Sequence, residues 1–221
     1  MLPEIVGHDP EVSSAGTAAG RHSYEVVVVV ASLGGLTVIQ TILAALPDRF
    51  PLPILLVLHG MRSESGDRDR LTWLLQRHTG LPVRTARRGM PALAHGVTVI
   101  PGGFAATIDT AGQICLAQTT AVGGDDLLTS AAARINFGGV IGVVLTGMLH
   151  DGAAGARAVK RRGGRVLAQD PVTARAPSMP LSAIATGCVD EVLSPERIAS
   201  ALITLTSEPD GSELLAVPTP P

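Results

Sequence analysis

A run of five valines, followed by a serine and two glycines, is the feature that most constrains the fold of this chain. Residues 26–30 are all valine, and residues 31–35 read Ala-Ser-Leu-Gly-Gly. Consecutive β-branched residues predict a strand that is buried on both faces, as in a parallel sheet. A serine at the end of such a strand lies at the carboxyl edge of the sheet, where open α/β folds carry out their chemistry. Because N–H groups at the start of the next helix can stabilise an oxyanion, the pattern favours a serine hydrolase over a nucleotide-binding protein.

Apolar strands and helical patterns alternate along the rest of the chain. Strands are expected at residues 25–31, 54–58, 97–100, 105–108, 114–117, 139–146, 165–169 and 188–192. Helices are expected at residues 36–46, 67–79, 125–136, 153–162, 180–186 and 195–206. The glycine-containing turns within residues 82–118 predict an antiparallel hairpin added to the sheet. The chain is therefore predicted to be a doubly wound α/β protein with a mostly parallel, Rossmann-like three-layer sheet and a small antiparallel hairpin addition.

The composition is that of an aliphatic globular domain. Of 221 residues, 46% are hydrophobic but only 2% are aromatic, so the core must consist mainly of Val, Leu, Ile and Ala. This length is enough for one well-buried core or at most two small domains. We expect a flexible leader over residues 1–23, a folded catalytic domain over residues 24–207 and a disordered tail over residues 208–221.

Several classes of function are disfavoured by the same composition. A net charge of −2 and few aromatic residues argue against a nucleic-acid partner. The chain lacks a run of eighteen apolar residues, so we expect no membrane span. It also lacks a basic stretch followed by an apolar run at its start, so we expect no signal peptide. Cys115 and Cys188 lie in apolar runs and suit a reducing cytoplasm. No complete G-x-G-x-x-G follows the first strand, so dinucleotide binding is a weak alternative.

Three side chains suited to nucleophilic catalysis follow three of the predicted buried strands. Ser32 follows the first strand, His59 the second, and Asp151 the strand at 139–146. Parallel strands bring their carboxyl ends to one edge, so these residues are expected to meet there. In acyl transfer, a histidine takes the serine proton and a carboxylate orients the ring. Each residue also has a simpler interpretation, because Ser32 and Asp151 could cap helices and His59 could be a partly exposed residue at a strand end.

Five short blocks of sequence carry a resemblance to a known family. They read Ala-Ser-Leu-Gly-Gly at 31–35, Leu-His-Gly at 58–60, Leu-Thr-Gly-Met-Leu-His-Asp-Gly-Ala at 145–153, Gly-Gly at 163–164 with Ala-Gln-Asp at 168–170, and Ser-Met-Pro at 178–180. In their order and spacing, over about residues 24–206, they resemble the catalytic domain of the chemotaxis protein-glutamate methylesterases, the CheB family.

That resemblance implies a doubly wound α/β fold and a reaction. The reaction is hydrolysis of glutamate γ-methyl esters on the cytoplasmic domains of methylated chemoreceptors, with deamidation of certain glutamines as a related activity. Ser32 would be the nucleophile, His59 the general base and acid, and Asp151 its orienting partner. Leu33 and Met148 would lie at the oxyanion site and active-site rim. No metal or organic cofactor is implied, and the chain has no HExxH or CxxC spacing.

The chain departs from the family pattern at the expected rim of the site. The family has Thr at the position of Leu33, Met at Gly60 and Gly at Leu149, and the block His-x-Pro-Ser-x-Asp corresponds to residues 120–125, where only Asp125 is kept. These departures leave three functions open. The chain could be a methylesterase, a hydrolase of the same mechanism acting on another ester or amide, or a non-catalytic signalling module that binds its partners.

Regulation is the last expectation from the resemblance. Family members usually carry an N-terminal receiver domain, for which residues 1–23 are too short. We expect the site either to be constitutively uncovered or to be controlled by a separate receiver protein or chemotaxis kinase. A several-fold change in rate on adding a phosphorylated receiver protein would contradict the constitutive version.

Overall fold

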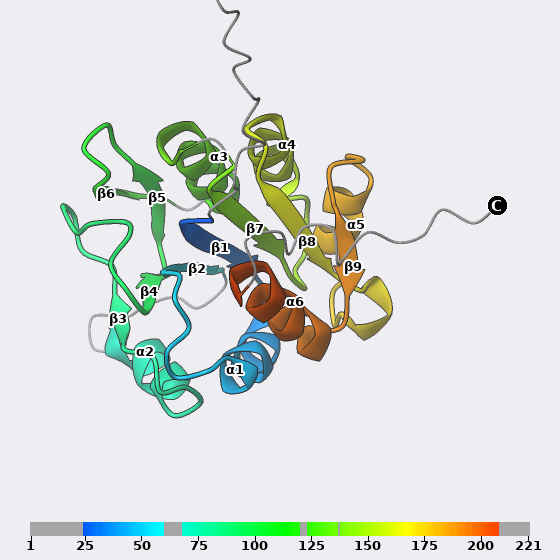
Figure 1. Ribbon diagram of the computed structural model, residues 1–221, viewed down its shortest axis with the longest axis horizontal. Helices are drawn as coiled ribbons and strands as arrows, with labels where there is room; N and C mark the ends of the chain where they lie inside the picture. Colours follow the sequence, from blue (N-terminus) through cyan, green and yellow to red (C-terminus); the bar gives the residue numbers. More distant parts are fainter. Residues whose placement is uncertain (1–23, 60–67, 120–122, 137, 208–221) are drawn as a thin grey trace, which may run out of the picture.

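The computed structural model describes residues 24–59, 68–119, 123–136 and 138–207 (Figure 1). The predicted leader at 1–23 and the predicted tail at 208–221 lie outside the described residues, as do Gly60 and residues 120–122. None of the described helices is long and apolar enough to cross a bilayer.

A seven-stranded sheet forms the centre of the structure, and all of its neighbouring strands are parallel. In spatial order its strands are β3 (Val83–Thr85), β4 (Val97–Ile100), β2 (Ile54–Leu58), β1 (Val26–Ala31), β7 (Val140–Val144), β8 (Arg165–Gln169) and β9 (Glu191–Leu193). The five valines of β1 are buried because this strand is central and helices cover both of its faces. The fold class predicted from the sequence is confirmed.

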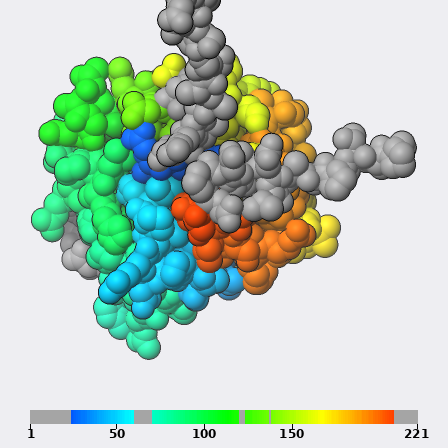
Figure 2. Space-filling view, in the orientation of Figure 1, coloured from blue at the N-terminus to red at the C-terminus, as the bar shows by residue number. Residues whose placement is uncertain are grey.

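Helices cover the two faces of this sheet. They are α1 (Gly35–Ala45), α2 (Arg68–Gln76), α3 (Gly124–Arg134), α4 (Ala153–Arg161), α5 (Ser178–Ile184) and α6 (Pro195–Ser207), with a 3-10 turn at Pro171–Thr173. One aliphatic cluster joins the sheet to α1, α2 and α6, and a second joins it to α3, α4 and α5. Figure 1 shows α3 and α4 above the strands and α1 and α6 below them, and α1 and α6 adjoin on the face seen in Figure 2.

The hairpin differs in one respect from the expectation. Strands β5 (Phe104–Ile108) and β6 (Ile114–Gln118) form a separate two-stranded antiparallel sheet, while Val97–Ile100 belongs to the main parallel sheet. The hairpin packs against α3 and does not extend the main sheet. The strand predicted at 188–192 lies instead at Glu191–Leu193, and the short edge strand β3 was not predicted.

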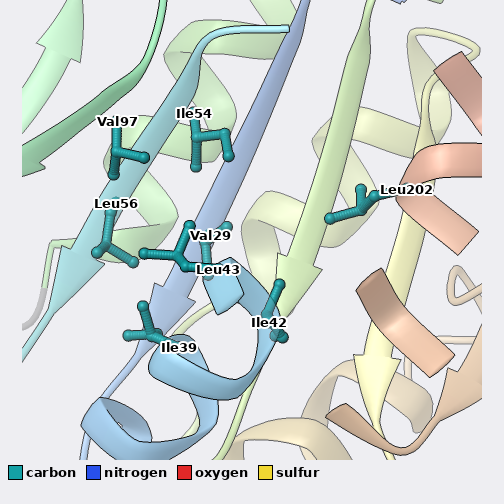
Figure 3. Close-up of a pocket in the computed structure, with 8 residues that line it drawn as sticks. All are labelled: Val29, Ile39, Ile42, Leu43, Ile54, Leu56, Val97 and Leu202. Carbon is teal, nitrogen blue, oxygen red and sulfur yellow. The ribbon is translucent and has the colours of Figure 1, made fainter. Parts of the chain in front are cut away.

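A small hollow lies between the sheet and helices α1 and α6 (Figure 3). Its walls are entirely aliphatic and are formed by Val29, Ile39, Ile42, Leu43, Ile54, Leu56, Val97 and Leu202. These side chains belong to the core cluster under α1, and none of the candidate catalytic residues lines the hollow. We therefore interpret it as a packing feature of the core.

The topology places a switch point at the centre of the sheet. From β1 the chain first builds the half of the sheet that contains β2, β4 and β3, and then returns to β7 on the other side of β1. Successive connections leave β1 and β7 in opposite directions, and in open α/β sheets ligands bind outside the carboxyl ends of the strands at such a point. The segments that follow β1 and β7 are therefore the first place to look for a functional site.

Candidate active site

Ser32 and His59 are neighbours because β1 and β2 pair in parallel. Ala31 lies opposite Leu58 in the register, and the next residues on the two strands are Ser32 and His59. The His59 N–H donates to the Ala31 carbonyl at 2.9 Å, so the backbone ladder extends up to the site. The sheet itself fixes the separation of the two residues, since neighbouring strands lie roughly 4.8 Å apart.

Backbone contacts hold the turn after Ser32 in place. The Ser32 N–H donates to the Thr146 carbonyl at 2.9 Å, which ties the end of β1 to the segment after β7. Gly147 lies so close that a Cβ on it would be 2.8 Å from the Ser32 Cβ and 2.0 Å from the Met179 sulfur. Only a glycine fits this position, which brings the loop after β7 against the serine.

Three donors surround the Asp151 carboxylate. Its Oδ2 lies 3.0 Å from His59 Nε2 and accepts from the Gly124 N–H at 3.0 Å, while Oδ1 accepts from the Asp125 N–H at 3.0 Å. Gly124 and Asp125 open α3, so the carboxylate lies at the positive end of that helix. The simpler interpretation of Asp151 as the cap of the helix that follows it is wrong, because it caps α3 instead.

The electrostatic environment favours an ionised Asp151. Burial is the largest influence and acts to raise its pKa, since the side chain is only 2% exposed. The hydrogen bonds from His59, Asp125 and Gly124, together with the charge of His59, outweigh that cost and leave the pKa of Asp151 below its usual value. A fixed negative charge therefore faces the imidazole.

This charge decides which nitrogen of His59 carries a proton. Nε2 faces the Asp151 carboxylate at 3.0 Å and also lies 3.3 Å from the Gly123 N–H. In a neutral imidazole, Nε2 either carries a proton and donates to the carboxylate, or carries a lone pair and accepts from the Gly123 N–H, but it cannot do both. An ionised carboxylate favours the proton on Nε2, which leaves the Nδ1 lone pair to accept a proton from another group.

Ser32 lies at the end of the strand next to that of His59. Its side chain is partly exposed, and among the described residues no hydrogen bond joins its hydroxyl to His59. Hydrogen bonds between a nucleophile and its base often tighten only when substrate is bound. The structure thus brings Ser32, His59 and Asp151 together, with the His59–Asp151 contact already made.

Three exposed apolar side chains lie in the two segments that meet at the serine, the turn after β1 and the loop after β7. Leu33 is 45% exposed, and Met148 and Leu149 are each 57% exposed. Leu149 has a φ of 68°, and no other non-glycine residue of the described segments has a positive φ. A leucine in this left-handed region is strained, and such strain is found mainly at functional sites. We call these three side chains the apolar rim.

Two backbone donors are available beside the rim. Within the described residues, neither the Leu33 N–H nor the Met148 N–H is used in a hydrogen bond. Leu33 follows the serine directly, and Met148 follows the glycine that packs on it. Unused N–H groups beside a nucleophile are suited to bind an oxyanion.

Several other polar residues make structural contacts or lie at the surface. His95 contacts the Phe50 carbonyl, and Asp170 accepts from the Val172 N–H and so caps the 3-10 turn. His150 is exposed next to Asp151. Within the described ranges, no group of three or more His, Cys, Asp or Glu side chains could hold a metal ion, and Cys115 and Cys188 are free thiols.

Analysis of the sequence missed the groups that hold the carboxylate. These are the N–H groups of Gly124 and Asp125, which donate to the Asp151 carboxylate. Backbone donors have no signature of their own, but two glycines and two acids at 123–126, before an apolar helical pattern, mark a helix start. The sequence accordingly predicts a helix over residues 125–136, but its local pattern does not show that the first N–H groups of this helix face Asp151.

The class of protein follows from the fold and the site. A doubly wound α/β domain with a serine, a histidine and a carboxylate at its switch point is typical of α/β serine hydrolases. A model of the CheB methylesterase family matches residues 27–202. The chain belongs to this family, as the five sequence blocks predicted.

Individual relatives support this assignment. A protein of Leptospira interrogans is 34% identical over 188 residues, which are 83% of this chain and 95% of that protein. Protein-glutamate methylesterase/protein-glutamine glutaminase 3 of Geobacter sulfurreducens is 34% identical over 198 residues, and these are 86% of this chain but 52% of the longer relative. The crystal structure of the Thermotoga maritima CheB methylesterase catalytic domain matches with a TM-score of 0.74 and 33% identity, covering 83% of this chain and 99% of that one.

Proposed function

We propose that this protein is a serine hydrolase that removes methyl groups from glutamate γ-methyl esters on the cytoplasmic domains of chemoreceptors, and that it also deamidates receptor glutamines. The observation that carries the proposal is the ion pair between His59 and Asp151 beside Ser32, at the switch point of a CheB-family fold. Deamidation follows because the same attack on a side-chain amide yields the same acyl intermediate.

The reaction would proceed through an acyl-enzyme. The Ser32 Oγ attacks the ester carbonyl carbon while its proton passes to His59 Nδ1, and the ionised Asp151 stabilises the resulting imidazolium. The Leu33 and Met148 N–H groups would bind the oxyanion. The tetrahedral intermediate expels methanol, which takes the proton from His59. Water then attacks the acyl-enzyme with His59 as base, releasing glutamate and restoring Ser32.

Methanol release from a methylated chemoreceptor cytoplasmic fragment tests this proposal directly. The wild-type protein is expected to release methanol in proportion to the methyl groups present, and none from the unmethylated fragment. Ammonia release from a fragment with glutamine at the same sites tests deamidation. A folded protein that releases neither product from verified substrate would contradict the proposed function.

The apolar rim favours a second candidate, a hydrolase of the same mechanism with a different ester or amide substrate. Leu33, Met148 and Leu149 expose apolar surface in the two segments that meet at Ser32. Substrates with an aliphatic group beside the scissile bond would bury that surface, which stabilises binding by about 25 cal/mol per Å². Activity on small activated esters without activity on receptor fragments would support this candidate.

Replacing Leu149 tests how the rim contributes to substrate binding. Leu149→Asn keeps a similar size and tolerates a positive φ, but it removes the apolar surface. We expect KM for an ester flanked by aliphatic residues to rise by roughly 10-fold with kcat little changed, because about 1.4 kcal/mol of uniform binding is lost. Leu149→Met, which keeps the apolar surface, serves as the matched control. Equal KM values for the two variants in steady-state assays would show that the rim does not bind substrate.

The domain division and the cellular setting belong to the same proposal. We propose that residues 24–207 form the catalytic domain, that the protein acts in the cytoplasm where the receptor domains lie, and that a separate receiver protein or chemotaxis kinase is its regulatory partner. The match of the family model to residues 27–202 supports the first of these statements. We propose no metal, organic cofactor or nucleic-acid partner.

A further inference from the structure

The first turns of α3 and α4 are each capped by a carboxylate from the other segment. Asp151, which precedes α4, accepts from the N–H groups of Gly124 and Asp125 in α3. Asp125, in the first turn of α3, accepts from the Gly155 N–H in α4 at 2.6 Å. Neither helix is capped by the side chain of its own N-cap residue, which is a glycine in both cases. The N–H groups at the start of α3 are therefore satisfied by Asp151, just before α4, and an N–H group at the start of α4 is satisfied by Asp125 of α3.

We propose that Asp125 is a positioning residue that holds the His59–Asp151 pair in its reactive geometry, an inference that rests on the proposed hydrolase function. Its side chain fixes the first turn of α3 against α4 through Gly155. Its own N–H, with that of Gly124, fixes the Asp151 carboxylate. Movement of this turn would displace Asp151 from His59.

The packing of the two helix starts leaves little room for another arrangement. A Cβ on Gly124 would lie 2.4 Å from Asp151 Oδ2, and a Cβ on Gly155 would lie 2.4 Å from the Leu128 Cβ. Both glycines allow the helices to approach closely. The Asp125–Gly155 bond thus joins two turns that already pack as one unit, and its effect reaches the carboxylate without an intervening flexible segment.

The charges of the two acids support the assignment of different roles. Burial, the largest influence, raises the pKa of Asp125; the Gly155 N–H lowers it, and the Asp151 charge raises it again, leaving the pKa above its usual value. The pKa of Asp151 is lowered. The two neighbouring carboxyl groups are therefore shifted in opposite directions, and the one that faces His59 is the one whose ionised form is favoured.

Three substitutions separate positioning from simple helix stabilisation. Asp125→Ala removes the acceptor for Gly155, and we expect kcat to fall by about 10–100-fold with KM little changed, as for a displaced catalytic group. Asp125→Asn keeps an acceptor oxygen without the charge, and it should restore kcat to within about threefold of wild type. Asp126→Ala is the matched control, because Asp126 is an exposed acid in the same helical turn that makes no bond to α4.

Two readouts distinguish failure of this inference from failure of the proposed function. The first is methanol release. The second is the rate at which a fluorophosphonate ester labels Ser32, a reaction that needs no receptor substrate. In it the Oγ bonds to phosphorus, the P–F bond breaks, fluoride leaves with the electron pair and the hydroxyl proton passes to His59. Wild-type labelling without methanol release would reject the receptor substrate alone, and the three variants would then be compared by labelling.

The inference predicts a fixed order of rates: wild type, Asp126→Ala and Asp125→Asn fast, and Asp125→Ala slow. Equal rates for wild type and Asp125→Ala would overturn it, as would Asp125→Asn being as slow as Asp125→Ala, or Asp126→Ala falling with them. A wild-type protein that neither releases methanol nor labels would overturn both proposals. If Asp125→Ala does not fold, Asp125→Glu replaces it, since the longer side chain keeps the charge but misplaces the oxygen; an unchanged rate in that variant would overturn the inference.

Discussion

Alanine in place of Ser32 is expected to lower the rate of methyl ester hydrolysis by at least about 10³-fold, because the attacking oxygen is lost and only substrate binding and oxyanion donors remain. The fold should be unaffected. The backbone of Ser32 makes its structural hydrogen bonds: its N–H donates to the Thr146 carbonyl, and its carbonyl accepts from the Gly35 N–H. We therefore expect the free energy of unfolding to change by no more than about 0.5 kcal/mol.

The measurement is methanol release by wild type, Ser32→Ala and a control, with thermal unfolding followed on the same samples. Ser200→Ala is a suitable control, since this exposed serine lies on α6, on the opposite side of the sheet from α3 and α4. Unchanged hydrolysis in Ser32→Ala would place the nucleophile elsewhere. Loss of activity together with a large drop in melting temperature would mean that the serine is needed for folding instead.

The central sheet was predictable from the sequence because burial on both faces leaves a strong pattern. The valines of β1 and the aliphatic run of β2 are strands by composition alone. The edge strands behave differently. β3 (Val83–Thr85) is only partly buried and β9 (Glu191–Leu193) pairs on one side, so neither has an apolar run long enough to mark its position.

The error at the hairpin has a related cause. Val97–Ile100 is fully buried, and four apolar or β-branched residues fit a parallel strand as well as an antiparallel one. Its place was decided by pairing with β2 on one side and β3 on the other. Local sequence carries no information on which of two distant partners a strand will join, so only the pair that shares a short turn, β5 and β6, was predictable as a hairpin.

The candidate site divides in the same way. Ser32, His59 and Asp151 could be predicted because each follows a strongly patterned strand and topology brings those ends together. What holds Asp151 was not predictable, because the donors are backbone N–H groups of α3, more than twenty residues earlier in the chain. The positive φ of Leu149 could not be predicted either. Leucine strongly prefers a negative φ, so this conformation is imposed by the surrounding structure and not by the local sequence.

Asparagine in place of Asp151 is expected to lower kcat by about 10⁴-fold, through the protonation of His59. The wild-type carboxylate accepts from three N–H groups, those of Gly124, Asp125 and His59. Asparagine replaces one oxygen with an amide NH2, so either α3 or His59 must lose its acceptor. When the NH2 faces His59, Nε2 becomes the acceptor and Nδ1 carries the proton, and the ring can no longer take the proton of Ser32. Asp170→Asn is the matched control, because Asp170 caps a turn with a single oxygen that asparagine retains.

The same substitution has a consequence for stability that depends on pH. The pKa of Asp151 in the folded protein lies below its ordinary value of 3.8, so the ionised group stabilises the fold above that pH. This stabilisation is lost as the pH falls through the lowered pKa, when the folded protein must take up the proton. Asparagine does not titrate. The difference in free energy of unfolding between wild type and Asp151→Asn should therefore be largest near neutral pH and should shrink below about pH 4. Urea unfolding at a series of pH values measures it, and a difference that stays constant into acid would mean that Asp151 is not held as an anion by His59 and α3.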